Sequence, residues 1–243
     1  MSAATAGVLV VFAKAPRAGR VKTRMVPPLT PAEAAGLYAS LLADVLEASA
    51  RFARELGLEA LVTVHPAATC GEIARIAPPG FRVVSQRGAD LAQRMSWAAR
   101  EAAAAGATRI LLRGSDSPLL GGASVARALA ALDAHDIVLC PDLDGGYSLV
   151  GLRRPEPGLF DHPMSTRSVL DDTLARAAEL GLRARVEAAS FDLDTIEDLR
   201  PLAALRSRPH ETLLCRHTLE YADEHDLWRY LGGPGRGGRA SGR

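Results

Sequence analysis

Cysteine is scarce in this sequence. The three cysteines, Cys70, Cys140 and Cys215, are spread over 243 residues without a CxxC pair. An odd number at such wide spacing argues against a disulfide framework and against a structural zinc site. We therefore expect the chain to work in a reducing compartment, the cytoplasm.

The sequence also lacks an excess of either charge and any long apolar run. Its 29 Lys and Arg against 28 Asp and Glu give a net charge of +1, which provides no general attraction to nucleic acid or acidic membranes. No run of 18 apolar residues occurs, and Ala3 to Phe12 is too short for a signal peptide or a membrane span. We expect a soluble protein with no nucleic-acid and no membrane partner, whose 48% hydrophobic residues suit one large α/β domain.

Lysine is even scarcer, and its distribution is uneven. Only two of the 29 basic residues are lysines, and both lie in one loop after an apolar run at Val8 to Phe12 that is typical of a buried strand. Pro16 and Gly19 prevent a direct continuation into a helix. The loop has no acidic residue and holds five basic ones: Lys14, Arg17, Arg20, Lys22 and Arg24. Because these charges repel one another, the loop is either a phosphate site or a solvated surface turn.

Short apolar segments alternate with helical segments along most of the chain. This alternation predicts an α/β fold with a mostly parallel sheet and helices on both faces. The predicted strands are residues 8–12, 58–64, 81–85, 108–112, 136–140, 147–152 and 183–186; the predicted helices are 31–56, 70–76, 91–105, 124–132, 168–180 and one beginning near 195. The strands at 136–140 and 147–152 are close enough in sequence to form a hairpin. Residues 1–207 form the predicted main domain, 208–231 a helical appendage, and the Gly/Arg/Ser-rich 232–243 a disordered tail.

Acidic residues follow the predicted strands, where such sheets bind ligands. Asp116 comes directly after the apolar strand at 108–112, and Asp142 and Asp144 follow the strand at 136–140. Asp192 and Asp194 have the alternate spacing that places two carboxylates on one side of an extended segment. Carboxylates of this kind suit Mg²⁺ or Mn²⁺, which proteins hold with one or two acids together with substrate phosphates.

Each of these acids also has a purely structural interpretation. Asp116 is in a sequence suited to a turn, and Asp194 is placed to cap the helix that begins near Thr195. Asp144 with Gly145 and Gly146 is typical of a hairpin turn, although the glycine pair also lets a ligand approach the backbone.

Six motifs, taken together, resemble the DUF2064 family of GT-A-like transferases. The motifs run in order between Val8 and Leu205: FAKAPRAGRVKTRM, QRGADLAQRM, LLRGSDSPLL, PDLDGGYSLVGL, MSTRSVL and FDLDTIEDL. The resemblance implies a GT-A/Rossmann-like three-layer sandwich that binds a nucleotide diphosphate. Members of the family are regarded as glycosyltransferases, some linked with arsenosugar biosynthesis, and are distantly related to sugar-phosphate, molybdopterin and phospholactate nucleotidyltransferases.

The resemblance also assigns roles to residues. It implies that Lys22 and the loop around Gly19 hold phosphates and that Asp116 binds the metal. Because Ser115-Asp116-Ser117 has one acid where GT-A enzymes often have Asp-X-Asp, the second metal ligand falls to Asp192 or Asp194. The expected nucleotide and phosphate site comprises Lys14, Arg17, Gly19, Lys22, Arg24, Gln86 and Gly88, and the expected acceptor site comprises Asp142, Gly145, Gly146, Tyr147, Ser165 and Thr166.

Two reactions fit this set of residues. Our first interpretation is a glycosyltransferase in which Lys22 and a divalent cation bound by Asp116 stabilise the departing diphosphate of a nucleotide sugar. Asp144 would then orient or deprotonate the hydroxyl of a small acceptor. The alternative is a nucleotidyltransferase, similar to phospholactate guanylyltransferases or molybdopterin nucleotidyltransferases, that releases pyrophosphate from an NTP. A nucleotide-binding regulatory module is a third reading, disfavoured because paired carboxylates are superfluous for binding alone.

Overall fold

Seven strands form one mixed sheet in the order β3-β2-β1-β4-β6-β5-β7. The computed structural model describes residues 7–164, 166–208 and 212–231 of the chain. The strands are β1 (Val8–Ala13), β2 (Glu59–Val64), β3 (Phe81–Ser85), β4 (Ile110–Arg113), β5 (Ile137–Pro141), β6 (Tyr147–Leu152) and β7 (Ala184–Val186). Only β6 is antiparallel to its neighbours β4 and β5, and every other pairing is parallel. The predicted α/β fold and the predicted β5–β6 hairpin are both confirmed.

Helices cover both faces of the sheet because side chains alternate along the central strands. In β1, Leu9 packs in the cluster formed with α1 (Pro31–Leu56) and α4 (Gly122–Ala131), whereas Val10 packs in the cluster formed with α3 (Leu91–Ala104) and α5 (Val169–Glu179). The other elements are α2 (Cys70–Ile76), α6 (Leu199–Leu205), α8 (Arg216–Glu224), η1 (Thr23–Met25), η2 (Ala67–Thr69), η3 (Ile196–Asp198) and η4 (Leu227–Leu231). The loops that follow the strands therefore lie at the ends of the sheet and not on its faces.

Local signals fix several helix ends as the sequence predicts. Thr30 and Glu33 form a reciprocal capping box at the start of α1, and Gly57 ends that helix with φ 66°. The Asp90 side chain accepts the Gln93 N–H at 2.8 Å and caps α3. The predicted strand at 108–112 is displaced, because β4 begins at Ile110 and includes Arg113, whose backbone pairs with β1 and β6.

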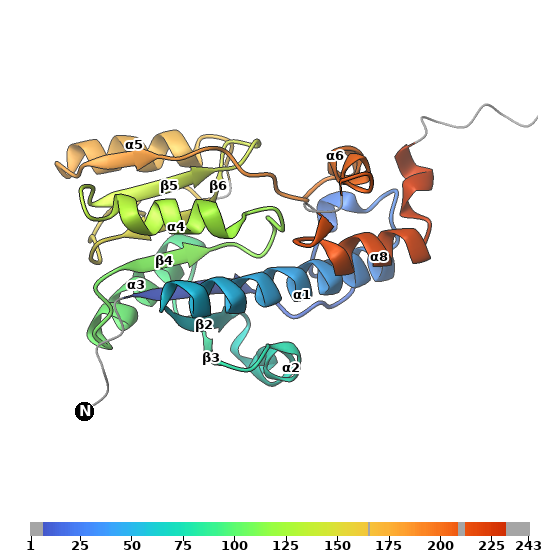
Figure 1. The fold of residues 1–243 in the computed structure, drawn as a ribbon, viewed down its shortest axis with the longest axis horizontal. Helices are drawn as coiled ribbons and strands as arrows, with labels where there is room; N and C mark the ends of the chain where they lie inside the picture. The colour runs from blue at the N-terminus through green and yellow to red at the C-terminus, as the bar shows by residue number, and fades with distance from the viewer. Residues whose placement is uncertain (1–6, 165, 209–211, 232–243) are drawn as a thin grey trace, which may run out of the picture.

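The C-terminal elements pack beside α1 at the end of the molecule where α6 also lies (Figure 1). The contact depends on Asp44, a carboxylate of α1 that is only 4% exposed. It accepts the backbone N–H groups of His217 and Thr218 at 2.9 and 2.8 Å and the Thr218 hydroxyl at 2.6 Å. Asp44 thus satisfies free N–H groups at the start of α8. The predicted tail, 232–243, lies outside the described residues.

No helix in the described ranges is both long and apolar enough to cross a membrane.

Replacing Asp44 tests whether this contact stabilises the C-terminal elements. We expect Asp44→Ala to lower the free energy of unfolding by about 2 to 4 kcal/mol, because buried N–H and O–H donors lose a charged acceptor. The matched control is Glu47→Ala, which removes an exposed partner of the His217 ring and should cost no more than about 0.5 kcal/mol. Urea unfolding of both variants measures the difference, and equal losses would contradict the assigned role of Asp44.

Candidate active site

A cleft of about 1160 Å³ lies at the edge of the sheet formed by the carboxyl ends of β1, β4 and β5. Segments far apart in the sequence line it: the loop after β1, the start of α3, the turn after β4, the β5–β6 loop, the segment before α5, and the extended segment before η3, together with Tyr38 of α1 and Gln86. This is the edge of the sheet at which the sequence predicts ligand binding.

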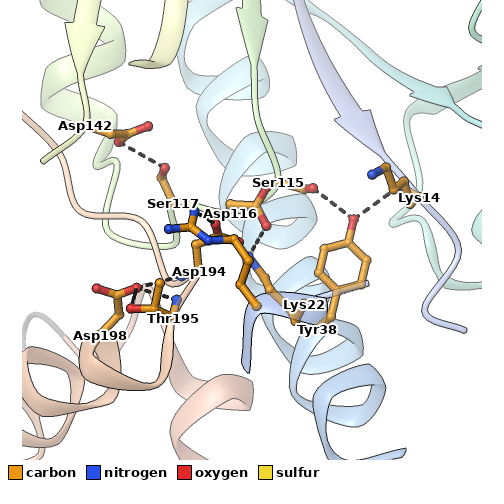
Figure 2. Close-up of polar contacts among 11 residues, drawn as sticks. Lys14, Lys22, Tyr38, Ser115, Asp116, Ser117, Asp142, Asp194, Thr195 and Asp198 are labelled. Carbon is orange, nitrogen blue, oxygen red and sulfur yellow. Dashed lines mark hydrogen bonds and ion pairs between the residues drawn. The ribbon is translucent and has the colours of Figure 1, made fainter. Parts of the chain in front are cut away.

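Lys22 is the most constrained cation of the cleft. Its backbone has the left-handed conformation, with φ 47° and ψ 37°, which is uncommon for a residue with a side chain. The side chain is only 2% exposed, yet Nζ is bonded to the Asp116 carboxylate and lies 3.6 Å from Asp194 Oδ1. Figure 2 shows this ion pair joining the loop after β1 to the turn after β4. Lys22 is therefore not a solvated surface lysine.

Tyr38 of α1 supports both of these segments, although the sequence analysis did not select it. Its hydroxyl lies 2.9 Å from Ser115 Oγ and accepts the Lys14 backbone N–H at 3.1 Å (Figure 2). Burial raises the pKa of Tyr38 well above its usual range, so the phenol stays neutral. A phenolic hydroxyl on a helix face otherwise lined by Leu37, Leu41 and Leu42 was a signal that could have identified it.

The turn that carries Asp116 is held by its neighbours on every side. Gly114 N–H donates to the Ser148 carbonyl of β6 at 3.0 Å, and the Asp116 carbonyl accepts from Leu193 N–H at 2.9 Å. The Asp116 side chain remains 48% exposed in the cleft. A rigid backbone with an accessible carboxylate suits a residue that binds a ligand.

Carboxylates form the opposite side of the cleft and repel one another. Burial, together with the charges of Asp192, Asp144 and Asp116, raises the pKa of Asp142 to about 8. The Ser117 hydroxyl, which donates to Asp142 Oδ1 at 3.2 Å, acts in the opposite direction. Burial, followed by Asp144 and Asp198, raises the pKa of Asp192 to about 6. Negative charge predominates on this side of the cleft, and a cation would lower its electrostatic energy.

The expected metal ligands are close to one another but are not arranged around a common point. Among the described residues, no three acidic, histidine or cysteine side chains are grouped to hold a metal ion. Lys22 instead bridges Asp116 and Asp194, and Arg24 is bonded to Asp194. The carboxylate oxygens of Asp116, Asp192 and Asp194 do have the donor chemistry that Mg²⁺ and Mn²⁺ require.

The predicted phosphate-binding residues separate into two groups. Lys14, Lys22, Arg24 and Gln86 line the cleft, as does Arg20 of the same loop. Three others do not line it: Arg17, Gly19 and Gly88. Their roles are local.

Those local roles have clear physical causes. Arg17 is bonded to Glu72 of α2, outside the cleft. Gly19 has φ 72° and forms the turn of the basic loop, and the Gly88 carbonyl accepts from Arg94 Nε at 3.1 Å. Arg94, the next-to-last residue of the QRGADLAQRM motif, also lines the cleft and was missed.

The predicted acceptor residues also lie mostly in the cleft. Its lining includes Asp142, Gly146, Tyr147 and Thr166, together with Arg167, which the sequence analysis did not select. Gly145 is behind the surface, where an added Cβ would lie 2.0 Å from the Arg167 carbonyl oxygen. Asp144 Oδ1 accepts the Gly146 N–H at 3.0 Å, as in the turn interpretation. Ser165 lies outside the described residues.

Comparison with known proteins agrees with this fold. Residues 48–166 match the family model DUF2064, "uncharacterized protein conserved in bacteria". The chain is 32% identical over 193 residues to phosphoenolpyruvate guanylyltransferase of Chloroflexus aggregans, covering 75% of this chain and 91% of that protein. The chain belongs to the DUF2064 family. It is 31% identical to 2-phospho-L-lactate guanylyltransferase of Methanothermobacter thermautotrophicus, covering 73% of this chain and 76% of that protein.

Solved structures share the fold of this chain. A candidate nucleotide-diphospho-sugar transferase from Desulfovibrio desulfuricans G20 superposes with a TM-score of 0.81 at 26% identity, covering 93% of this chain and 98% of that one. The 4-diphosphocytidyl-2C-methyl-D-erythritol synthase of Anaerococcus prevotii shares the fold, with a TM-score of 0.56 at 10% identity over 84% of this chain and 98% of that one. This DUF2064 protein is therefore an enzyme, a transferase with the fold of cytidylyltransferases and GT-A-like enzymes.

The raised pKa of Asp142 predicts a stability that depends on pH. The native pKa of about 8 exceeds the ordinary value of 3.8, so the native state binds this proton more tightly than the unfolded state does. The contribution of Asp142 therefore falls as the pH rises from about 4 to about 8. We expect Asp142→Asn to stabilise the metal-free protein at pH 8 by about 1 to 3 kcal/mol, a range reduced for solvent screening, and to change it little at pH 4.5.

Chemical denaturation in EDTA at several pH values measures this difference. Asp161→Asn is the control because it removes one exposed carboxylate outside the cleft. Parallel profiles for the wild type and Asp142→Asn would contradict the assigned pKa.

Proposed function

We propose that this protein is a nucleotidyltransferase that transfers a nucleoside monophosphate from an NTP to the phosphate of a small phosphorylated acid. The observation that carries the proposal is the direct contact between a buried lysine of the basic loop and Asp116 in the cleft. It brings cations for a triphosphate beside carboxylates for its metal ion. The two guanylyltransferase relatives favour GTP as the donor and a phosphorylated carboxylic acid as the acceptor.

The chemistry needs little beyond charge and position. An oxygen of the acceptor phosphate attacks the α-phosphorus of the NTP, the bond from that phosphorus to the bridging oxygen breaks, and pyrophosphate leaves with the electron pair. Lys14, Arg20 and Lys22 line the same side of the cleft and would hold the phosphates of the donor. Stabilising the charge that develops on the leaving pyrophosphate lowers the barrier.

A divalent cation fits the acidic side of this cleft. Asp116, with Asp192 or Asp194, would hold Mg²⁺ or Mn²⁺, which when bound supplies positive charge to the triphosphate. The mutual repulsion that raises the pKa of Asp192 supports such a cation. In the ligand-free chain Lys22 neutralises Asp116, so a bound triphosphate would compete for Lys22 as it brings its own metal ion.

The acceptor would lie beside the β5–β6 loop. Gly146, Tyr147, Thr166 and Arg167 line that part of the cleft, and Arg167 offers a cation to an acidic acceptor. A phosphate acceptor is already ionised at neutral pH and needs no general base. In this reaction Asp144 shapes the β5–β6 loop, where its carboxylate accepts the Gly146 N–H.

Glycosyl transfer is the second candidate. It is favoured by the similarity to the Desulfovibrio protein, which covers nearly all of both chains. In that reaction the same cations would stabilise a nucleoside diphosphate as it leaves, and Asp144 would act on an acceptor hydroxyl.

A pyrophosphate-release assay distinguishes the two reactions. We expect release with Mg²⁺ or Mn²⁺ only when GTP and phosphoenolpyruvate or 2-phospholactate are both present, with the coupled product identified by mass spectrometry. Asp116→Asn should lower kcat at least about 100-fold, and Asp161→Asn is the control. Free diphosphate from a nucleotide sugar would favour glycosyl transfer. If no NTP and acid pair gives pyrophosphate, nucleotidyl transfer to such acids is wrong.

Lys22→Arg tests whether the cleft requires a compact ammonium group. The buried position leaves little room for a planar guanidinium, so we expect nucleotide affinity to fall about tenfold, or about 1.4 kcal/mol. Lys14 is exposed in the same loop, and Lys14→Arg should change affinity less than about threefold. Titration calorimetry with GTP measures the Kd of both variants. An unchanged Kd in Lys22→Arg would contradict the requirement for a compact ammonium group at this position.

A further inference from the structure

The bulkiest fully buried side chain in the described structure is charged. It belongs to Arg113, the last residue of β4, which has 0% exposure. The three residues before it, Ile110 to Leu112, are apolar, as expected for a central strand. Burial lowers the pKa of Arg113 to about 10, so the guanidinium is still a cation at neutral pH. An apolar residue would fill this position without the desolvation cost of a buried charge.

The contacts of Arg113 lead from α1 to the turn after β4. One terminal nitrogen donates to Ser49 Oγ of α1 at 2.8 Å, and the other donates to the Ser117 carbonyl at 3.0 Å. The guanidinium carbon also lies 5.9 Å from the centre of the Phe52 ring. Within the described ranges Nε has no hydrogen-bond partner. The Asp142 carboxylate interacts with the guanidinium electrostatically, but the hydrogen bonds of the charged group go to Ser49 and to the backbone of the turn.

Ser117 connects Arg113 to the acidic side of the cleft through two hydrogen bonds. Its carbonyl accepts from Arg113, while its hydroxyl donates to Asp142 Oδ1 at 3.2 Å. On the other side of the turn, Tyr38 holds the Ser115 hydroxyl. Asp116 thus lies between Ser115 and Ser117 (Figure 2), whose positions are fixed by the buried side chains of Tyr38 and Arg113.

We propose that Arg113 is a positioning residue for the transfer reaction: it fixes the Ser115–Asp116–Ser117 turn so that the Asp116 carboxylate faces Lys22 and the cleft. It touches neither donor nor acceptor and acts through the Ser117 carbonyl. A lysine at this position would retain the charge but could form a well-aligned hydrogen bond with only one of the two partners, Ser49 or the Ser117 carbonyl. The activity part of this inference rests on the proposed function.

The test compares Arg113→Met and Arg113→Lys with a core variant that leaves the turn alone. Val125→Ala in α4 is the control, because Val125 is fully buried in the cluster that also contains Phe52 and its truncation destabilises the core without touching residues 114–117. All variants are assayed at a temperature at which circular dichroism shows them folded. Hydrogen exchange of the peptide that contains residues 114–117 gives a measurement that needs no catalysis.

We expect Arg113→Met to lower kcat at least tenfold, with KM for the NTP within threefold of wild type, and to increase exchange of the turn at least tenfold. Arg113→Lys should be intermediate in both measurements. Val125→Ala should lose thermal stability while retaining its kcat and its exchange in the turn. If Arg113→Met does not fold, Arg113→Lys carries the same comparison.

Two results would overturn the proposal. One is a loss of kcat in the Arg113 variants that Val125→Ala reproduces at equal loss of stability. The other is wild-type exchange of the turn in a folded Arg113 variant. If the wild type releases no pyrophosphate, the proposed function fails, and hydrogen exchange still decides whether Arg113 fixes the turn.

Discussion

The contact between Lys22 and Asp116 is the interaction on which the cleft depends. These two residues are 94 positions apart, so their contact requires β1 and β4 to be neighbours in the sheet, as they are. A lysine side chain that is only 2% exposed is stable as a cation only with a carboxylate beside it. The ion pair therefore holds together two loops that would otherwise carry unbalanced charge.

The Lys22–Asp116 ion pair does not balance the other charges of the cleft. Asp142 and Asp192, on the same side of the cleft as Asp116, have raised pKa values because burial and neighbouring carboxylates disfavour their ionised forms. Across the cleft, Lys14 and Arg20 are exposed cations. A polyanion alone would suit only one side, and a cation alone only the other. The metal-bound triphosphate that we propose as donor would bring both charges at once and so would suit both sides.

The sequence predicted what depends on local chemistry and missed what depends on distant contacts. Thr30, Pro31 and Glu33 specify the start of α1 within one turn, so the capping box was predictable. Other features depend on residues dozens of positions apart, which no periodicity in the sequence predicts. They are the order of the strands, the burial of Arg113 and the hydrogen bond by which Tyr38 holds Ser115. Arg17 illustrates the same limit: its charge indicated phosphate, but the carboxylate of Glu72 in α2, 55 positions away, is bonded to it.

Glycosyl and nucleotidyl transfer differ in the nucleophile that attacks the donor. The residues on the donor side of the cleft suit both reactions, so the acceptor side must distinguish them. In both reactions the same cations would receive a departing phosphate group. A sugar acceptor presents a neutral hydroxyl and needs a base, whereas a phosphorylated acid presents an anion and needs cations. On the acceptor side, Arg167 lines the cleft, while the Asp144 carboxylate already accepts a backbone N–H of its own turn. That combination suits an anionic acceptor better than a hydroxyl that must lose a proton.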